Sequence, residues 1–194
     1  FLGASTTLNE DDINEDFFEN VGFLIIEGYL WSSETARNAI KKAIEISKRK
    51  KIKIFFSLSD QGLTRMYLND FLELIEGSID VLIGNEKEYY EIFHTQDNNS
   101  ISKKIFGLVD AGVMTKSSRG ATLFEKKSFF NVETPTVKNV VDTTGAGDMF
   151  VAGLLYKLQI NESFRKSAEF GCQVAAKIIT QFGARPPGDF KKFF

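Results

Sequence analysis

The chain has 194 residues, of which 43% are hydrophobic, and it carries a formal net charge of −2. This length and apolar content predict one folded domain with a buried core, and the near-neutral charge excludes the basic field of a nucleic-acid-binding protein. The single cysteine, Cys172, excludes an intrachain disulfide, and the sequence lacks a run of about 18 apolar residues that would indicate a membrane span.

The first part of the chain alternates between predicted strands and predicted helices. Apolar runs typical of buried strands occur at 22–27, 52–57 and 79–84. After the first of them, Ser33 is placed to cap a helix. A second helix is expected over 63–75, and a third begins near Asn85.

The second part of the chain adds a helix, a strand and a hairpin before two closing helices. Ser100 and Ser102 are the candidate caps of a helix that precedes a strand at 112–116. A hairpin with arms at 121–125 and 128–133 follows. The alternation predicts an α/β fold with a mostly parallel sheet flanked by helices, and ligands gather at the carboxyl ends of such strands.

Residues 142–148 read Asp-Thr-Thr-Gly-Ala-Gly-Asp and lie directly before an apolar pattern with helical spacing. Gly145, Ala146 and Gly147 therefore fall where the first helical turn leaves backbone N–H groups without partners. Small side chains let an anion approach these groups, and the helix dipole favours negative charge there. Asp148 adds a carboxylate to the same turn. Phosphoryl transfer needs this combination of donors for the phosphoryl charge and an acceptor for a hydroxyl proton.

The same segment also has a structural interpretation. A glycine-rich turn before a helix is common, and a lone aspartate in a first turn often serves only the helix dipole. The segment is not a Walker A loop, because no Gly-Lys-Ser/Thr follows. Phe150 stands where a dinucleotide fingerprint needs its third glycine. The local pattern alone leaves a catalytic and a structural role open.

The segment 142–153 resembles the C-terminal signature of the PfkB family of carbohydrate kinases, within the ribokinase-like superfamily. Shorter stretches at 27–31 and 58–60 are similar to bacterial members known as adenosine kinase-like proteins or sugar kinases. The family's other motifs are matched in order, with its Asn-x-x-Glu pattern first, at 85–88, 113–121 and 175–186. The resemblance covers essentially the whole chain and implies a ribokinase-like fold.

The resemblance implies a role for each matched residue. Asp148 would accept the hydroxyl proton, while the N–H groups of residues 145–147 hold the charge on the phosphoryl oxygens. Asn85 and Glu88 would organise Mg²⁺ through water, and Asp142 would bind a monovalent cation such as K⁺. The residues expected to contact ATP are Asn85, Thr115, Ser117, Gly120, Thr144 and Gly183.

Structural roles compete with these assignments. Asn85 and Glu88 are also spaced to form a helix cap with a carboxylate in the first turn. Asp142 is equally suited to an Asx turn. The family usually has glycine where Lys116 and Ser117 stand, which leaves the adenine side of the site open.

The family pattern extends upstream of Phe1, because its opening strands, most of its small β lid and its sugar-gripping residues have no counterpart here. We expect residues 1–8 to be a remnant of the lid and residues 9–194 to be the C-terminal portion of the nucleotide-binding and catalytic domain. Without the opening strands, the sheet would present an uncovered edge and an apolar face, which promote association.

The leading hypothesis is a cytoplasmic, ATP- and Mg²⁺-dependent kinase that phosphorylates a primary hydroxyl of a small molecule. Adenosine or a related nucleoside ranks first as substrate and a sugar second. No nucleic-acid or membrane partner is expected, and a homodimer is compatible with the pattern. The alternative is a non-catalytic binding or regulatory module with the same fold, against which Asp148 argues. The missing glycine fingerprint disfavours a Rossmann-type oxidoreductase.

Overall fold

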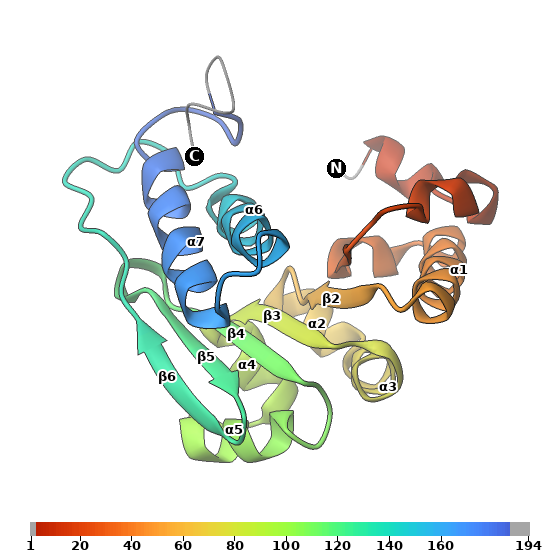
Figure 1. Ribbon diagram of the computed structural model, residues 1–194, viewed down its shortest axis with the longest axis horizontal. Coiled ribbons are helices and arrows are strands. Elements are labelled where there is room, and N and C mark those ends of the chain that lie inside the picture. The colour runs from red at the N-terminus through yellow and green to blue at the C-terminus, as the bar shows by residue number, and fades with distance from the viewer. Residues whose placement is uncertain (1–2, 187–194) are drawn as a thin grey trace. The chain divides into compact units, whose positions relative to one another are not determined.

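The computed structural model describes residues 3–186, which contain a six-stranded sheet in the order β1-β2-β3-β4-β5-β6 (Figure 1). The chain forms two compact units. The first consists of the residues up to Thr115 together with Phe124–Phe129, and the second of Lys116–Leu123 together with the residues from Phe130 onward.

Parallel strands form the sheet of the first unit, and neighbours in sequence are neighbours in the sheet. In this register Glu27 lies beside Ser57, and Asn85 lies beside Thr115. The carboxyl ends of the strands therefore share one edge of the sheet. The strands are β1 (Phe23–Glu27), β2 (Lys53–Ser57), β3 (Val81–Asn85) and β4 (Ala111–Thr115).

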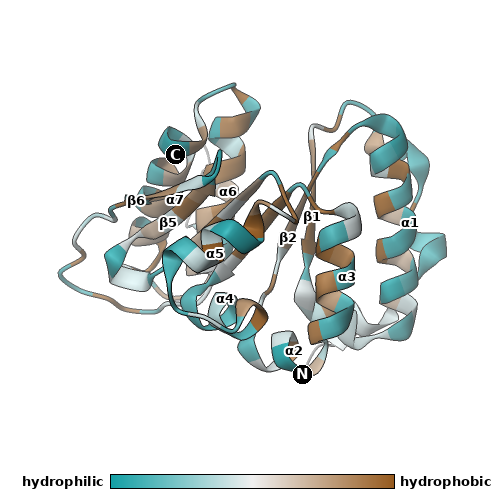
Figure 2. Ribbon diagram, turned by 90° about the horizontal axis from the view of Figure 1, so that it is seen from below, coloured by the Kyte–Doolittle hydropathy of each residue, from teal (hydrophilic) through white to brown (hydrophobic). Residues whose placement is uncertain are grey.

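The helices of the first unit connect these strands and pack their apolar sides on the sheet. Figure 2 shows hydrophobic and hydrophilic residues separated on α1 and α3, as expected for helices with one buried side. In the core, the Phe71 ring of α3 meets the Phe56 ring of β2 edge-on, with 5.0 Å between ring centroids. The helices are α1 (Glu34–Lys50), α2 (Gln61–Met66), α3 (Leu68–Ser78), α4 (Glu86–Phe93) and α5 (Asn98–Ile105).

Two long helices dominate the second unit, α6 (Ala146–Gln159) and α7 (Phe164–Ile178). Their shared core contains Met149 from α6 and Val174 and Ile178 from α7. Cys172 of α7 is buried, and burial raises the pKa of its thiol to about 11. Cys172 is therefore a packed core thiol in this structure.

The hairpin spans both units. It consists of β5 (Ala121–Glu125) and β6 (Ser128–Val132), joined at Lys126 and Lys127 as expected. Both lysines have positive φ angles, which is typical of tight hairpin turns. Among residues 3–186, no helix is long and apolar enough to cross a membrane.

The α/β fold with a mostly parallel sheet confirms the sequence-based prediction, but several details differ. The helix expected over 63–75 is two helices, α2 and α3, separated at Tyr67, whose φ of −112° and ψ of 29° are not helical. The sequence has no proline or glycine at this position to signal the break. Arg65 on α2 is instead tied to Glu91 on α4, which holds the short helix in place.

Two predicted helix caps are also corrected. Helix α5 is capped by Asp97 rather than by Ser100 or Ser102. The Asp97 carboxylate accepts hydrogen bonds from the backbone N–H groups of Asn99 and Ser100. Ser33 does stand at the N-cap of α1, but its hydroxyl donates to the Thr6 carbonyl instead of accepting from the helix.

The N-terminal segment adopts helical rather than strand structure. Gly3–Thr7 forms a 3₁₀ helix, and no strand occurs within residues 3–8. The assignment of residues 1–8 to a lid therefore stays a prediction, and residues 1 and 2 lie outside the described part of the chain.

Candidate functional site

The first turn of α6 forms the open anion cradle that the sequence indicates. The Ala146 N–H donates to the Thr143 carbonyl, and the Met149 N–H donates to the Gly145 carbonyl. Within residues 3–186, the N–H groups of Gly147 and Asp148 have no partner. A Cβ built on Gly147 would meet no atom within 4 Å. The two N–H groups are therefore available as donors to an anion, and the Gly147 position adds no steric obstacle of its own.

Asp148 lies in the same turn, and its side chain is exposed. No residue of the described chain forms a hydrogen bond or ion pair with its carboxylate. The carboxylate is thus available to a ligand that reaches the cradle, and it can accept a proton from that ligand.

Asp142 fastens the turn that precedes α6. Its Oδ1 accepts the Thr144 N–H at 2.9 Å, which is an Asx turn, and its Oδ2 accepts the Gly183 N–H at 2.9 Å. Hydrogen bonds from Thr144 and Gly183 hold the pKa of Asp142 below its usual value. The structure therefore contains the Asx turn that was the alternative to a cation-binding role for Asp142. The carboxylate oxygens keep further lone pairs that can bind a cation.

Gly145 joins the cradle to the turn that follows α7. Its φ of 79° is left-handed, and a Cβ at this position would lie 2.6 Å from the Cβ of Ala184. Only glycine allows both this backbone conformation and this close approach. The 142–148 motif and the turn at Gly183 are thus in direct contact.

In the first unit, Asn85 and Glu88 form a complete capping box at the end of β3. Asn85 Oδ1 accepts the N–H groups of Lys87 and Glu88, and Glu88 Oε2 accepts the Asn85 N–H at 2.8 Å. Asn85 Nδ2 also donates to Glu88 Oε1 at 2.6 Å. The helix-cap interpretation is therefore present in the structure.

Glu88 is an unusual cap because it is buried, with 4% of its surface exposed. Its pKa is raised to about 7, mainly by burial and in part by the nearby charges of Asp60 and Glu27, against the lowering effect of the Asn85 N–H. The raised pKa means that the surroundings disfavour the negative charge of the ionised Glu88 carboxylate. Such surroundings favour the binding of a cation.

Glu27, Ser59 and Asp60 lie in the stretches 27–31 and 58–60 that resemble the family, but the sequence did not identify them as site residues. Glu27 ends β1, and its Oε2 accepts a hydrogen bond from the Ser59 hydroxyl at 2.7 Å. Ser59 has a φ of 66°, and Asp60 caps α2 directly after it. Their position just past the carboxyl ends of β1 and β2 is the signal that would have identified them.

The turn after β4 carries the remaining expected nucleotide contacts. Thr115 ends β4 beside Asn85 in the first unit. Ser117 and Gly120 belong to the second unit, where the Lys116 N–H donates to the Gly120 carbonyl at 2.7 Å. Ser117 has a φ of 51°, a left-handed conformation that glycine adopts most easily.

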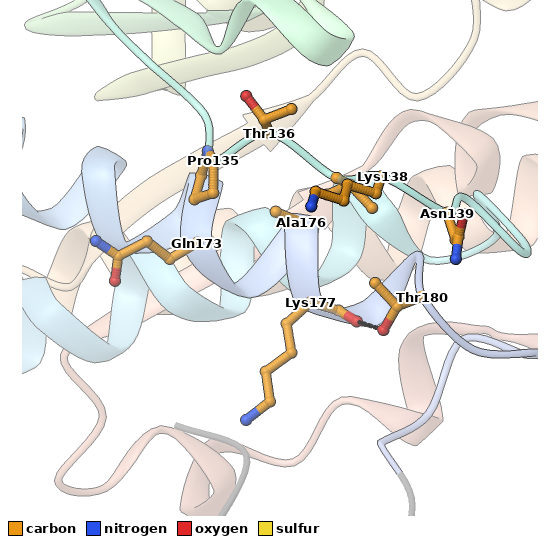
Figure 3. A pocket seen from close by; sticks show the side chains of 9 residues that line it. Pro135, Thr136, Lys138, Asn139, Gln173, Ala176, Lys177 and Thr180 are labelled. Atoms are coloured by element: carbon orange, nitrogen blue, oxygen red, sulfur yellow. Dashed lines mark hydrogen bonds between the residues drawn. The ribbon is translucent and has the colours of Figure 1, made fainter.

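A groove of about 560 Å³ runs along α7 in the second unit (Figure 3). The loop at 135–139 forms one wall, and Gln173, Ala176 and Thr180 line the helix side. Thr180 donates its hydroxyl to the Lys177 carbonyl, while the Lys177 side chain points away from Pro135 and Thr136. The sequence pattern gave no indication of this groove, because its lining residues form no motif.

The oxygen atoms of Asn85, Glu88 and their neighbours are of the chemical type that binds Mg²⁺. Carboxylate and amide oxygens are the ligands that Mg²⁺ prefers, and it commonly keeps several waters. Both Glu88 oxygens already accept hydrogen bonds, so the arrangement suits contact through water. Within residues 3–186, no group of three or more His, Cys, Asp or Glu side chains is arranged to hold a metal ion directly.

Comparison with known proteins identifies one family over nearly the whole chain. Residues 2–190 match the profile of the pfkB family carbohydrate kinases. A 5-dehydro-2-deoxygluconokinase of Geobacillus thermodenitrificans is 28% identical over 185 residues, which cover 91% of this chain and 55% of that protein. The enzyme of the same name from Clostridium beijerinckii is 25% identical over 187 residues, with coverages of 91% and 55%.

Solved structures with the same fold include a probable sugar kinase from Rhizobium etli and an adenosine kinase from Sinorhizobium meliloti. Their TM-scores are 0.90 and 0.89, each is 28% identical, and each comparison covers 94% of this chain and 56% of the other. A putative ribokinase II from E. coli in complex with ATP and Mg²⁺ has a TM-score of 0.83 at 22% identity, covers 92% of this chain and 58% of that one, and supports the fold alone. The chain spans about half the length of the curated relatives that it matches.

Proposed function

Because the chain belongs to the pfkB family of carbohydrate kinases, we propose that it transfers the γ-phosphoryl group of ATP to a primary hydroxyl of a sugar or nucleoside. The observation that carries this proposal is the first turn of α6. There, among the described residues, the exposed Asp148 carboxylate has no partner, and neither have two neighbouring N–H groups. A non-catalytic module would not need this combination of acceptor and donors.

In the proposed reaction, Asp148 accepts the hydroxyl proton as the oxygen attacks the phosphorus in line. The N–H groups of the first turn, which belong to Gly145, Ala146 and Gly147, stabilise the charge on the phosphoryl oxygens. The Ala146 N–H already donates to Thr143, so Gly147 and Asp148 offer the freer donors. Phosphoryl transfer depends mainly on positioning and charge, so a carboxylate of ordinary basicity is adequate.

Asn85 and Glu88 would hold Mg²⁺ through water on the nucleotide side. When bound, the ion neutralises charge on the phosphates. The burial of Glu88 near Asp60 and Glu27 supports this assignment, since a nearby cation relieves the cost of burying a carboxylate. We also assign a monovalent cation such as K⁺ to Asp142, supported by its free lone pairs and by the bend at Gly183.

The nucleotide would contact Thr115, Ser117, Gly120 and Thr144, as well as Asn85 and Gly183. We add the α7 groove as a candidate for the base. Its loop wall runs directly into the motif, since the Val141 N–H donates to the Ile179 carbonyl next to Thr180. Its apolar walls and amide side chains suit a flat heterocycle.

The substrate class is proposed from relatives rather than from contacts. The names of the curated relatives indicate that they act on a sugar derivative. Of the two solved structures that are 28% identical to this chain, one is a probable sugar kinase and the other is an adenosine kinase. The first rank given to adenosine therefore stays a prediction, and so do a cytoplasmic location and a homodimer.

The proposal is tested by incubating the purified protein with Mg-ATP and a panel of nucleosides, sugars and sugar acids. We expect ADP release that depends on one acceptor class, together with a phosphorylated product. ATP binding with no acceptor-dependent turnover would instead favour the non-catalytic module. Activity on sugar acids alone would reverse the ranking of adenosine.

A further inference from the structure

The cradle at α6 has two carboxylates and few positive charges to receive a polyphosphate. Asp142 and Asp148 both lie in the motif, and each would repel a triphosphate that approaches the turn. The helix N-terminus offers only about half an elementary charge. An arginine that binds phosphate with its planar fork would correct this imbalance.

Arg185 lies where such a cation is needed. A Cβ built on Gly145 would lie 2.8 Å from the Cα of Ala184, the residue before Arg185. Successive Cα atoms are 3.8 Å apart, so the Arg185 Cα lies within about 7 Å of that position. An extended arginine side chain is about as long as this distance, so the Arg185 guanidinium can approach the Gly145 end of the first turn of α6.

The backbone around Arg185 is held on both sides, while its side chain has no hydrogen-bond partner in the part of the chain that the structure describes. The Gly183 N–H is bound by Asp142, and the Arg185 carbonyl accepts a hydrogen bond from Gln181 Nε2 at 2.7 Å. Arg185 is exposed, and its guanidinium forms no ion pair with any residue within 3–186. A fixed backbone lowers the entropy cost of using the side chain to bind a ligand.

From these observations we propose that the Arg185 guanidinium binds the phosphates of the nucleotide at the N-terminus of α6. This inference rests on the proposed kinase function and adds a phosphate-binding residue to it. Arg185 contributes in two ways: it offsets the charges of Asp142 and Asp148, and it orients the phosphates through paired N–H donors.

The test is calorimetric titration of the protein and its Arg185→Gln variant with ATP, with inorganic tripolyphosphate and with adenosine. We expect the variant to bind ATP and tripolyphosphate about tenfold more weakly or worse, as for a lost charged hydrogen bond, and to bind adenosine as before. Arg185→Lys keeps the positive charge but lacks the paired N–H donors of the planar guanidinium. This variant should therefore recover part of the affinity for ATP.

Arg165→Gln is the matched control. Arg165 is an exposed arginine of the same unit that pairs with Glu169 on α7, away from the motif, so its loss should leave ATP binding unchanged. If the original protein binds ATP and Arg185→Gln binds it equally well, the inference is wrong and the proposed function stands. If the original protein does not bind ATP at all, the proposed function fails and the inference fails with it.

Discussion

Asp142 accepts a hydrogen bond from the backbone N–H of Gly183, 41 residues later in the chain, at 2.9 Å. The same carboxylate accepts the Thr144 N–H, so one side chain ties the turn before α6 to the turn after α7. Because Gly145 packs against Ala184 at the same place, the shape of the cradle depends on the C-terminal turn as well as on the motif.

The first prediction concerns this link. In Asp142→Asn, the side-chain oxygen can still accept the Thr144 N–H, but the NH₂ group cannot accept from Gly183. Amide hydrogen exchange at Gly183 should therefore become roughly tenfold faster, as for the loss of one hydrogen bond. The Thr144 N–H, which keeps its acceptor, is the internal control. Unchanged protection at Gly183 would show that the bond does not hold the turn.

The link also has a defined pH dependence. Since folding lowers the pKa of Asp142, its stabilising effect is present above the usual carboxyl pKa of about 4 and is lost as the pH falls through the lower folded-state value. Protection of the Gly183 amide should persist at pH 5 and fall below pH 4. A loss of protection between pH 7 and pH 5 would contradict the assigned partner.

Two glycines of the motif should respond differently to alanine. Gly145→Ala forces a left-handed φ and a close contact with Ala184, so the free energy of unfolding should fall by about 2–4 kcal/mol. Gly147→Ala meets no atom and lies in a helix, so stability should stay the same or rise slightly. The added methyl group would occupy open space in the first turn of α6, where the phosphoryl group is proposed to bind, so kcat should fall. Urea denaturation and turnover separate the two effects.

The buried carboxyl of Glu88 predicts an inverse pH dependence of stability. Its folded-state pKa of about 7 exceeds the ordinary value, so the folded chain holds a proton that the unfolded chain has released. The free energy of unfolding should therefore decrease as the pH rises toward 7. Glu88→Gln removes this titration, and between pH 5 and pH 8 it should gain roughly 2–3 kcal/mol relative to the original protein.

Urea denaturation of both proteins across this pH range is the measurement, in the absence of Mg²⁺. Glu91 is a suitable control residue, because its hydrogen bonds with Arg65 and Gln61 lower its pKa to about 2 and it stays ionised throughout. Glu91→Gln should therefore show the same pH dependence as the original protein. If Glu88→Gln also follows the original protein, the carboxyl of Glu88 does not titrate in this range.

Much of this arrangement could be predicted from local sequence patterns. The helix start at Gly145 and the cap at Asn85 depend on neighbouring residues only, and both were placed correctly. The break at Tyr67 was missed, because the residue at this position is neither proline nor glycine and the surrounding residues have the pattern of one continuous helix.

The parts of the site that escaped prediction are those formed by distant residues. The contact of Ala184 with Gly145 and the approach of Glu27 to Ser59 exist only in the folded chain. From the sequence, Asn85 and Glu88 could be either two residues that bind Mg²⁺ or a helix cap. The structure contains the helix cap. A role in metal binding remains a prediction because the two functions are compatible.

The most direct test of the central claim is turnover of the Asp148→Asn variant. The substitution keeps the shape of the side chain and removes the proton acceptor, so kcat should fall by roughly 10² or more. The affinity for ATP should stay the same or rise slightly, because one carboxylate that repels the phosphates is gone. Asp110→Asn, an exposed aspartate before β4, should have normal turnover. A large loss of kcat without a loss of ATP affinity is the result that we predict, and near-normal turnover of Asp148→Asn would contradict the mechanism.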